Sequence, residues 1–251
     1  MTSLNGKVIC ITGSASGMGL ELARLAGRQG ARLALADISQ GPLDKLVREL
    51  QDNGVDVIGT VLDVSSSAQV NNWVESTVKH YGRLDGAANL AGVVGRNHII
   101  GQLEELPDAE WNFILGVNLT GIMYCVRAQL RVMQRGAAIV NAASVAGAVG
   151  QPNMCAYAVS KHGVVGLTRS VAKEVGPRGI RVNCIGLGGV DTPMLQTVHG
   201  EEGAGLGPLS NVPMQRAGTP EELAKAFAFL LGDDSSYVSG AHLLVDGGLL
   251  A

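Results

Sequence analysis

The sequence predicts an α/β protein, with one doubly wound, Rossmann-type domain in which helices flank both faces of a seven-stranded parallel sheet. Short apolar runs rich in β-branched residues alternate with helix-periodic segments along the whole chain. The first of these runs leads directly into a glycine-rich turn and a helix. No linker, repeat or low-complexity tract interrupts the alternation, so residues 1–251 are expected to form a single domain.

The first elements follow the order strand, turn, helix, strand. Lys7–Thr12 is a β-branched apolar run and predicts a strand. Met18–Gln29 carries leucine and alanine at helical spacing, and Gly30 follows it as a residue typical of helix C-termini. Arg32–Ala36 then predicts the second strand, which leads into Asp37.

The same alternation continues toward the middle of the chain. Pro42–Asn53 predicts a helix that ends at Gly54, and Val55–Leu62 predicts the strand after it. Ser67–Tyr81 predicts a helix because serines suited to an N-cap precede its periodic pattern. Leu84–Leu90 predicts the fourth strand.

Two long helices dominate the second half. One is predicted over Asp108–Gln134, with its pattern interrupted at Gly116–Gly121, and the other over Asn153–Val175, ended by Gly176–Pro177. The remaining predictions are strands over Ala137–Ala143, Ile180–Ile185 and His242–Val245, and a helix over Glu221–Leu231. The irregular segment 193–215 is expected to be a loop excursion.

Composition and charge exclude several classes of protein. A hydrophobic content of 46% excludes a disordered chain. The net charge of -3 gives no reason to expect a nucleic-acid partner, and apolar stretches such as Phe227–Leu231 are far shorter than a membrane span. The scattered cysteines lack metal-ligand spacing; they are Cys10, Cys125, Cys155 and Cys184. We therefore expect a cytoplasmic protein with reduced thiols and no metal.

The glycine-rich turn after the first strand is a candidate phosphate-binding site. Its candidate cofactor-binding residues are Gly13, Ser16, Gly17, Met18 and Gly19. Glycines let a backbone approach a pyrophosphate, and a helix N-terminus offers free N–H groups and positive dipole. The alternative is a plain tight turn between strand and helix.

Asp37 stands 18 residues after the last glycine of this turn, at the end of the second predicted strand. An acid at about that distance typically accepts hydrogen bonds from the adenosine ribose of NAD and repels the 2′-phosphate of NADP. No basic residue follows it, because Ile38 holds that place. The sequence therefore favours NAD over NADP; the alternative is that Asp37 only caps the next helix.

The candidate catalytic residues are Ser144, Tyr157 and Lys161. Tyr157 and Lys161 are four residues apart on a predicted helix, so they share one face. A nearby ammonium lowers the pKa of a tyrosine, which then exchanges a proton with an alcohol oxygen more readily. Tyr-x-x-x-Lys alone occurs by chance on many helices. Ser144 strengthens the assignment because it follows a strand at the edge where parallel sheets bind ligands.

In this order, the turn, the acid, Ser144 and Tyr157-x-x-x-Lys161 resemble the short-chain dehydrogenase/reductase family over essentially the whole chain. The resemblance implies that Ser144 holds the substrate oxygen, Tyr157 is the general acid/base and Lys161 binds the nicotinamide ribose. It also implies that Asn118 kinks a helix and positions a water in a proton relay. The further cofactor contacts that it implies are Asp63 and Val64 at the adenine, Asn89, Ala91 and Gly92 along the adenosine, and Val190 and Thr192 near the carboxamide and pyrophosphate.

Two positions depart from the family pattern. Leu90 stands where the family often has a second asparagine, and Leu187 precedes Gly188 where a proline is usual. The missing proline is expected to loosen the loop over the nicotinamide.

The resemblance places the substrate between three segments: Val93–Ile100, Ala146–Cys155 and Pro193–Gln215. Their apolar residues are Val94, Val149, Met154, Met194 and Leu195, and possible polar contacts are His98, Gln151 and Asn153. These residues favour an apolar substrate.

The expected activity is NAD(H)-dependent interconversion of a secondary, cyclic or apolar alcohol and its ketone. The alternatives are an NADPH-dependent ketoreductase of a biosynthetic pathway and a catalytically idle dinucleotide-binding sensor or scaffold. The long helices are apolar on more than one face, which favours a homotetramer, with a homodimer as the alternative.

Overall fold

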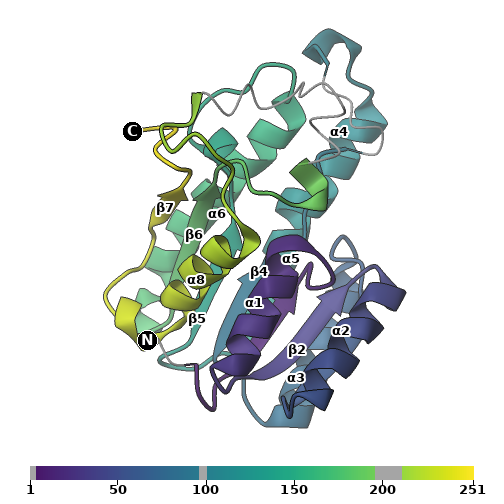
Figure 1. The fold of residues 1–251 in the computed structure, drawn as a ribbon, viewed down its shortest axis with the longest axis vertical. Helices are drawn as coiled ribbons and strands as arrows, with labels where there is room; N and C mark the ends of the chain where they lie inside the picture. The colour runs from purple at the N-terminus through teal and green to yellow at the C-terminus, as the bar shows by residue number, and fades with distance from the viewer. Residues whose placement is uncertain (1–3, 96–100, 196–210) are drawn as a thin grey trace.

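The computed structural model describes residues 4–95, 101–195 and 211–251 of the chain. Its strands form one parallel seven-stranded sheet in the order β3-β2-β1-β4-β5-β6-β7 (Figure 1), which confirms the predicted fold class. The strands are β1 (Val8–Thr12), β2 (Arg32–Asp37), β3 (Val57–Val61), β4 (Gly86–Asn89), β5 (Ala138–Ala142), β6 (Arg181–Leu187) and β7 (His242–Val245).

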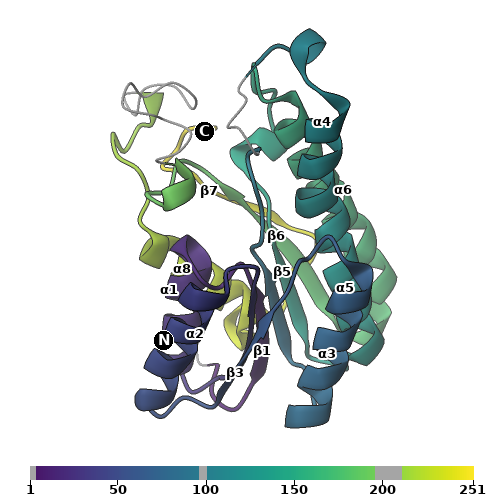
Figure 2. The ribbon, with the colours of Figure 1, turned by 90° about the vertical axis from the view of Figure 1, so that its right-hand side faces the viewer.

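Helices cover both faces of this sheet. The helices are α1 (Gly17–Arg28), α2 (Gln40–Asp52), α3 (Ser67–Tyr81), α4 (Asp108–Leu115), α5 (Ile122–Val132), α6 (Cys155–Val175) and α8 (Pro220–Leu231). Figure 2 shows α1, α2 and α8 on one face, and α3, α5 and α6 on the other. Short turns of 3-10 helix join several of these elements, among them η1 (Leu103–Glu105) and η3 (Val145–Gly147).

The sheet is buried because its strands face two hydrophobic layers. Along β1, Val8 and Cys10 pack into the layer under α3, α5 and α6, while Ile9 and Ile11 pack into the layer under α1 and α8. Alternate side chains of a strand point to opposite faces, so a strand between two layers is apolar throughout. This explains why the strands read as continuous apolar runs in the sequence.

The helix predicted over Asp108–Gln134 divides where its pattern is interrupted. A π-helical segment, η2 (Gly116–Gly121), joins α4 to α5. The run Asp108–Val132 is long and apolar enough by composition to cross a membrane. The shorter apolar stretches considered in the sequence did not predict such a run. A core helix meets the same criterion, and Ile114, Ile122 and Val126 of this run are buried.

Other element ends differ from the predictions for local reasons. Helix α6 begins at Cys155, because Asn153 has a left-handed φ of 62° that a helix cannot contain. Strand β6 extends through Leu187, which pairs with Val245 of β7. The predicted loop excursion 193–215 is described only at its ends, and residues 196–210 lie outside the described residues.

Candidate active site

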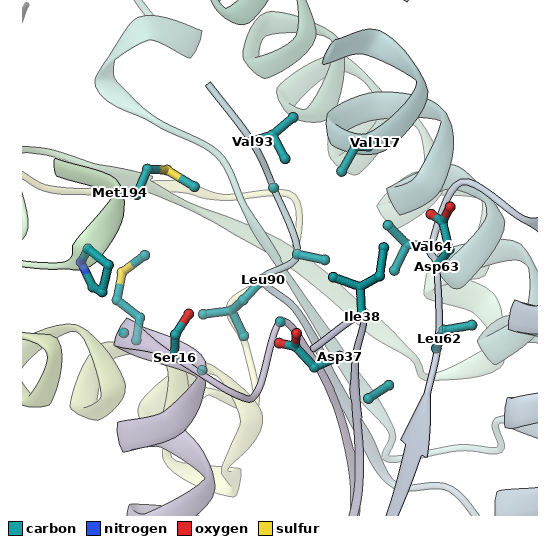
Figure 3. A pocket seen from close by; sticks show the side chains of 18 of the residues that line it. Ser16, Asp37, Ile38, Leu62, Asp63, Val64, Leu90, Val93, Val117 and Met194 are labelled. Carbon is teal, nitrogen blue, oxygen red and sulfur yellow. The ribbon is translucent and has the colours of Figure 1, made fainter. Parts of the chain in front are cut away.

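Two adjoining cavities lie at the carboxyl ends of the strands. The larger cavity has a volume of about 470 Å³ and runs from the glycine-rich turn to the end of β3 (Figure 3). The smaller cavity, of about 100 Å³, lies beside α6 and the end of β6. Both are lined by Met18, Leu90, Gly92, Val93, Thr192 and Met194. A ligand can therefore extend from one cavity into the other.

The glycine-rich turn borders the larger cavity. All five predicted residues of the turn line it: Gly13, Ser16, Gly17, Met18 and Gly19. Gly13 has a φ of 68°, and a Cβ on Gly19 would overlap the carbonyl oxygen of Gly13. Both positions therefore require glycine for the turn to close. Helix α1 begins within this turn, so its N-terminal N–H groups lie at the edge of the cavity.

Asp37 closes the opposite side of the turn. Its Oδ2 accepts a hydrogen bond from the Ala15 N–H at 2.9 Å, and its Oδ1 accepts one from the Ser39 N–H, also at 2.9 Å. Asp37 thus supports the segment before α2, and it also lines the cavity. The two sequence-based interpretations of this residue, cofactor contact and local cap, are therefore geometrically compatible. Ile38 beside it is 67% exposed at the mouth of the site.

The far wall of the larger cavity comes from the segments that follow β3 and β4. Asp63, Val64, Ala91 and Gly92 line it, as the resemblance implies. Phe113 and Val117 also line this cavity and were missed by the sequence analysis. Their separation of four residues, which places them on one helix face, was the available signal.

Asn89 is not among the residues that line the larger cavity, and its expected contact with the cofactor stays a prediction. Its side chain is fully buried, donates from Nδ2 to Oδ1 of Asn141 at 2.9 Å and accepts at Oδ1 from Nε2 of Gln129 at 2.9 Å. Asn89 is the last residue of β4, and its side chain lies on the face of the sheet that α5 covers, where it meets Gln129. The backbone that follows it, at Leu90 and Ala91, borders the cavity instead.

The three candidate catalytic residues meet in the smaller cavity. Ser144 lies two residues after the end of β5, while Tyr157 and Lys161 lie one turn apart on α6. The Oγ of Ser144 accepts a hydrogen bond from the Ala146 N–H at 3.1 Å. The Nζ of Lys161 donates to the Ala142 carbonyl at 2.9 Å and lies 5.4 Å from the centroid of the Tyr157 ring.

Burial sets the proton affinities of this group. It raises the pKa of Tyr157, and a hydrogen bond with Ser144 offsets part of that effect. Burial also lowers the pKa of Lys161 to about 8. The lowering of the Tyr157 pKa by Lys161 that the sequence predicts is not among the causes of the Tyr157 shift in the chain by itself. Lys161 is directed at a backbone carbonyl and is buried, whereas Tyr157 is partly exposed at the cavity.

Asn118 lies in the π-helical segment and is fully buried. Its Oδ1 accepts from the Val93 N–H at 2.8 Å, and its Nδ2 donates to the Val93 carbonyl at 2.8 Å and to Oγ of Ser160 at 3.3 Å. These bonds fix the segment after β4 against α6. The proton-relay role that the resemblance implies for Asn118 stays a prediction.

The substrate-side residues divide between the cavity wall and other places. Val94, Met154, Met194 and Leu195 line the smaller cavity together with Val190 and Leu187, while Thr192 lines both cavities. Val149 is 41% exposed and lines neither. Gln151 lies outside both linings, Asn153 borders an adjoining cavity, and His98 lies outside the described residues.

A doubly wound sheet with a glycine-rich first turn and a Ser-Tyr-Lys cavity at its carboxyl edge defines a dinucleotide-dependent oxidoreductase. Over residues 13–250 the chain matches the family model described as Enoyl-(Acyl carrier protein) reductase. The protein belongs to the short-chain dehydrogenase/reductase family, whose members bind a nicotinamide dinucleotide.

Two curated relatives and one solved structure show the range of this similarity. The chain is 47% identical to short-chain dehydrogenase/reductase aba4 of Botryotinia fuckeliana, covering 96% of each chain. It is 35% identical to cyclohexanol dehydrogenase of an Acinetobacter species, covering 97% of this chain and 94% of the relative. The crystal structure of levodione reductase superposes with a TM-score of 0.91 at 36% identity, covering 97% of each chain.

Proposed function

We propose that this protein is an NAD(H)-dependent oxidoreductase that interconverts a secondary, cyclic or apolar alcohol and its ketone. The observation that carries the proposal is the convergence of Ser144, Tyr157 and Lys161 on one small cavity that adjoins the glycine-rich site. This arrangement supports proton exchange beside the place where a nicotinamide dinucleotide fits.

The larger cavity suits NAD in shape and charge. The glycine-rich turn closes tightly, because a Cβ on Gly19 would meet backbone atoms of Gly13 and Ser14. The N-terminal N–H groups of α1 at the edge of the cavity are suited to bind a pyrophosphate. Among its lining residues that the structure describes, the charged side chains are Asp37 and Asp63. Two carboxylates repel the extra phosphate of NADP, whereas Asp37 retains acceptor capacity for ribose hydroxyls.

In the smaller cavity, each catalytic side chain has a role that its chemistry allows. Bound NAD supplies a hydride acceptor, and NADH a hydride donor, at the nicotinamide carbon. Tyr157 gives its phenolic proton to a carbonyl oxygen in reduction and takes the proton from the hydroxyl in oxidation. Ser144 donates a hydrogen bond to the same substrate oxygen. Lys161 and the positive charge of a bound nicotinamide both stabilise the phenolate and so counter the burial that raises the pKa of Tyr157.

The lining of the smaller cavity favours an uncharged, apolar substrate. Among the residues described there, Lys161 is the charged one, and most of the others are aliphatic or methionine side chains. A buried apolar wall binds hydrocarbon rings well and leaves a charged group without a partner. The names of two similar proteins, cyclohexanol dehydrogenase and levodione reductase, point in the same direction.

The assembly and the compartment belong to the same proposal. The π-helical segment η2 and helix α6 carry apolar residues that are only partly buried, such as Leu119 and Leu167. A second copy packed on this face would bury them, so we propose a homotetramer, with a homodimer as the alternative. The scattered, unpaired cysteines support a cytoplasmic location.

The test is NADH formation from NAD⁺ and a panel of cyclic and acyclic secondary alcohols, paired with melting curves. We expect NAD⁺ to raise the melting temperature and cyclic alcohols to be oxidised. Stabilisation by NAD⁺ without turnover of any alcohol would favour the idle dinucleotide-binding alternative. Stronger stabilisation by NADP⁺ than by NAD⁺ would favour the NADPH-dependent ketoreductase and contradict the cofactor assignment.

A further inference from the structure

A third cavity shares Met154 with the smaller cavity. This side cavity measures about 20 Å³ and lies between η1, α4 and the start of α6. Val94, Met154 and Tyr157 line both it and the smaller cavity. These three residues therefore form the partition between the two spaces, at the position of the catalytic tyrosine.

Most of the described side chains that line the side cavity are apolar. Leu103, Leu106, Ile114 and Ala156 line it, together with Val94. Its polar members are Asn153, the thiol of Cys155 and Tyr157. Such a wall accepts an alkyl group and offers little to a charged one. The present volume is too small for a chain of several carbon atoms, so an occupant must displace one of the lining side chains.

Met154 is the side chain best suited to move. Hydrogen bonds on both sides hold its backbone in place. The carbonyl of Asn153, a residue with a left-handed φ of 62°, accepts from the Gly101 N–H at 3.0 Å. The carbonyl of Met154 accepts from the Ala158 N–H at 2.8 Å. Its unbranched thioether side chain has three rotatable bonds and adapts to irregular spaces. The partition between the cavities thus combines a fixed backbone with an adaptable side chain.

We propose that Met154 is a specificity-determining residue, which swings aside to admit an alkyl substituent of the substrate ring into the side cavity. The inference rests on the proposed function, because it concerns the same catalytic cavity. It adds that the preferred substrate carries an apolar substituent next to the reacting carbon, beside Tyr157. An unsubstituted ring leaves the side cavity closed.

The first test compares cyclohexanone with 2-propylcyclohexanone as substrates for NADH-dependent reduction. Met154→Ala removes the partition, so we expect the ratio of kcat/KM values to shift by about tenfold toward the substituted ketone, an effect typical of a methylene group in an apolar pocket. Met194→Ala is the matched control, since Met194 lines the smaller cavity but not the side cavity. Met194→Ala should change the kcat/KM values of both ketones by the same factor. An unchanged ratio in Met154→Ala would overturn the proposal.

The second test needs no turnover and uses the wild-type protein. Cys155 lines the side cavity and is partly exposed, whereas Cys10, Cys125 and Cys184 are buried. We expect 2-propylcyclohexanone to slow alkylation of Cys155 by iodoacetamide, measured by mass spectrometry, and cyclohexanone to leave it unchanged. Equal rates with both ketones would contradict the proposal. If the wild type reduces neither ketone but 2-propylcyclohexanone still protects Cys155, the proposed activity is wrong and binding in the side cavity is supported.

Discussion

Asp37 offers the sharpest test of how the site binds its cofactor. Each of its oxygens already accepts one backbone N–H at 2.9 Å, which orients the carboxylate and leaves one further acceptor site on each oxygen. Two ribose hydroxyls fit those sites, and a hydrogen bond to a charged group contributes about 1.5–3 kcal/mol. Because Asp37 is only partly buried, water competes for the same acceptor sites. We therefore assign the two hydrogen bonds together a contribution of about 2–3 kcal/mol to NAD⁺ binding.

The perturbation is Asp37→Asn, which keeps the size of the side chain and removes its charge. At 1.4 kcal/mol per tenfold change, the affinity for NAD⁺ should fall about 30- to 150-fold. The affinity for NADP⁺ should rise, because repulsion of the 2′-phosphate is relieved. Both dissociation constants are measured by calorimetric titration.

Asp63→Asn is the matched control for this substitution. Asp63 lines the same cavity, and its Oδ1 accepts from the N–H and the hydroxyl of Ser65. If only the local charge mattered, both variants would weaken NAD⁺ binding similarly. Equal losses of NAD⁺ and NADP⁺ affinity in Asp37→Asn would refute the reasoning, because Asp37 would then act solely by holding Ala15 and Ser39.

Two further predictions concern the turn and the buried lysine. Gly19→Ala should abolish stabilisation by NAD⁺ in melting curves, because the new methyl group meets the Gly13 carbonyl and forces the turn apart; retained binding would contradict this. For Lys161, burial lowers the pKa from 10.5 to about 8, so between these pH values the unfolded chain binds more protons and the unfolding free energy rises with pH. The rise is worth about 3 kcal/mol, and denaturant titrations of the cofactor-free protein should show it in the wild type but not in Lys161→Met.

The parts of the site that depend on local patterns were predictable from the sequence. The turn at Gly13 and Gly19 and the acid at Asp37 follow from a strand, a helix and their spacing along the chain. Ser144, Tyr157 and Lys161 were also placed at one edge, since a strand end and one helical turn fix their positions.

The parts that depend on packing between distant segments were not predictable. Asn89 points into the interior because of its register in β4, where Asn141 and Gln129 satisfy it. The spacing of Phe113 and Val117 indicates one helix face, but it does not reveal that this face packs against the larger cavity. The raised pKa of Tyr157 likewise reflects burial by the assembled fold, which its spacing from a lysine does not reveal.

The most direct test of the proposed chemistry compares Tyr157→Phe with the wild type in NADH formation from NAD⁺ and the best alcohol of the panel. Phenylalanine keeps the ring and removes only the hydroxyl that exchanges the proton. We predict that kcat falls about 10²- to 10⁴-fold, as expected for loss of a general acid/base, while NAD⁺ still raises the melting temperature. Full turnover in Tyr157→Phe would contradict the assigned mechanism.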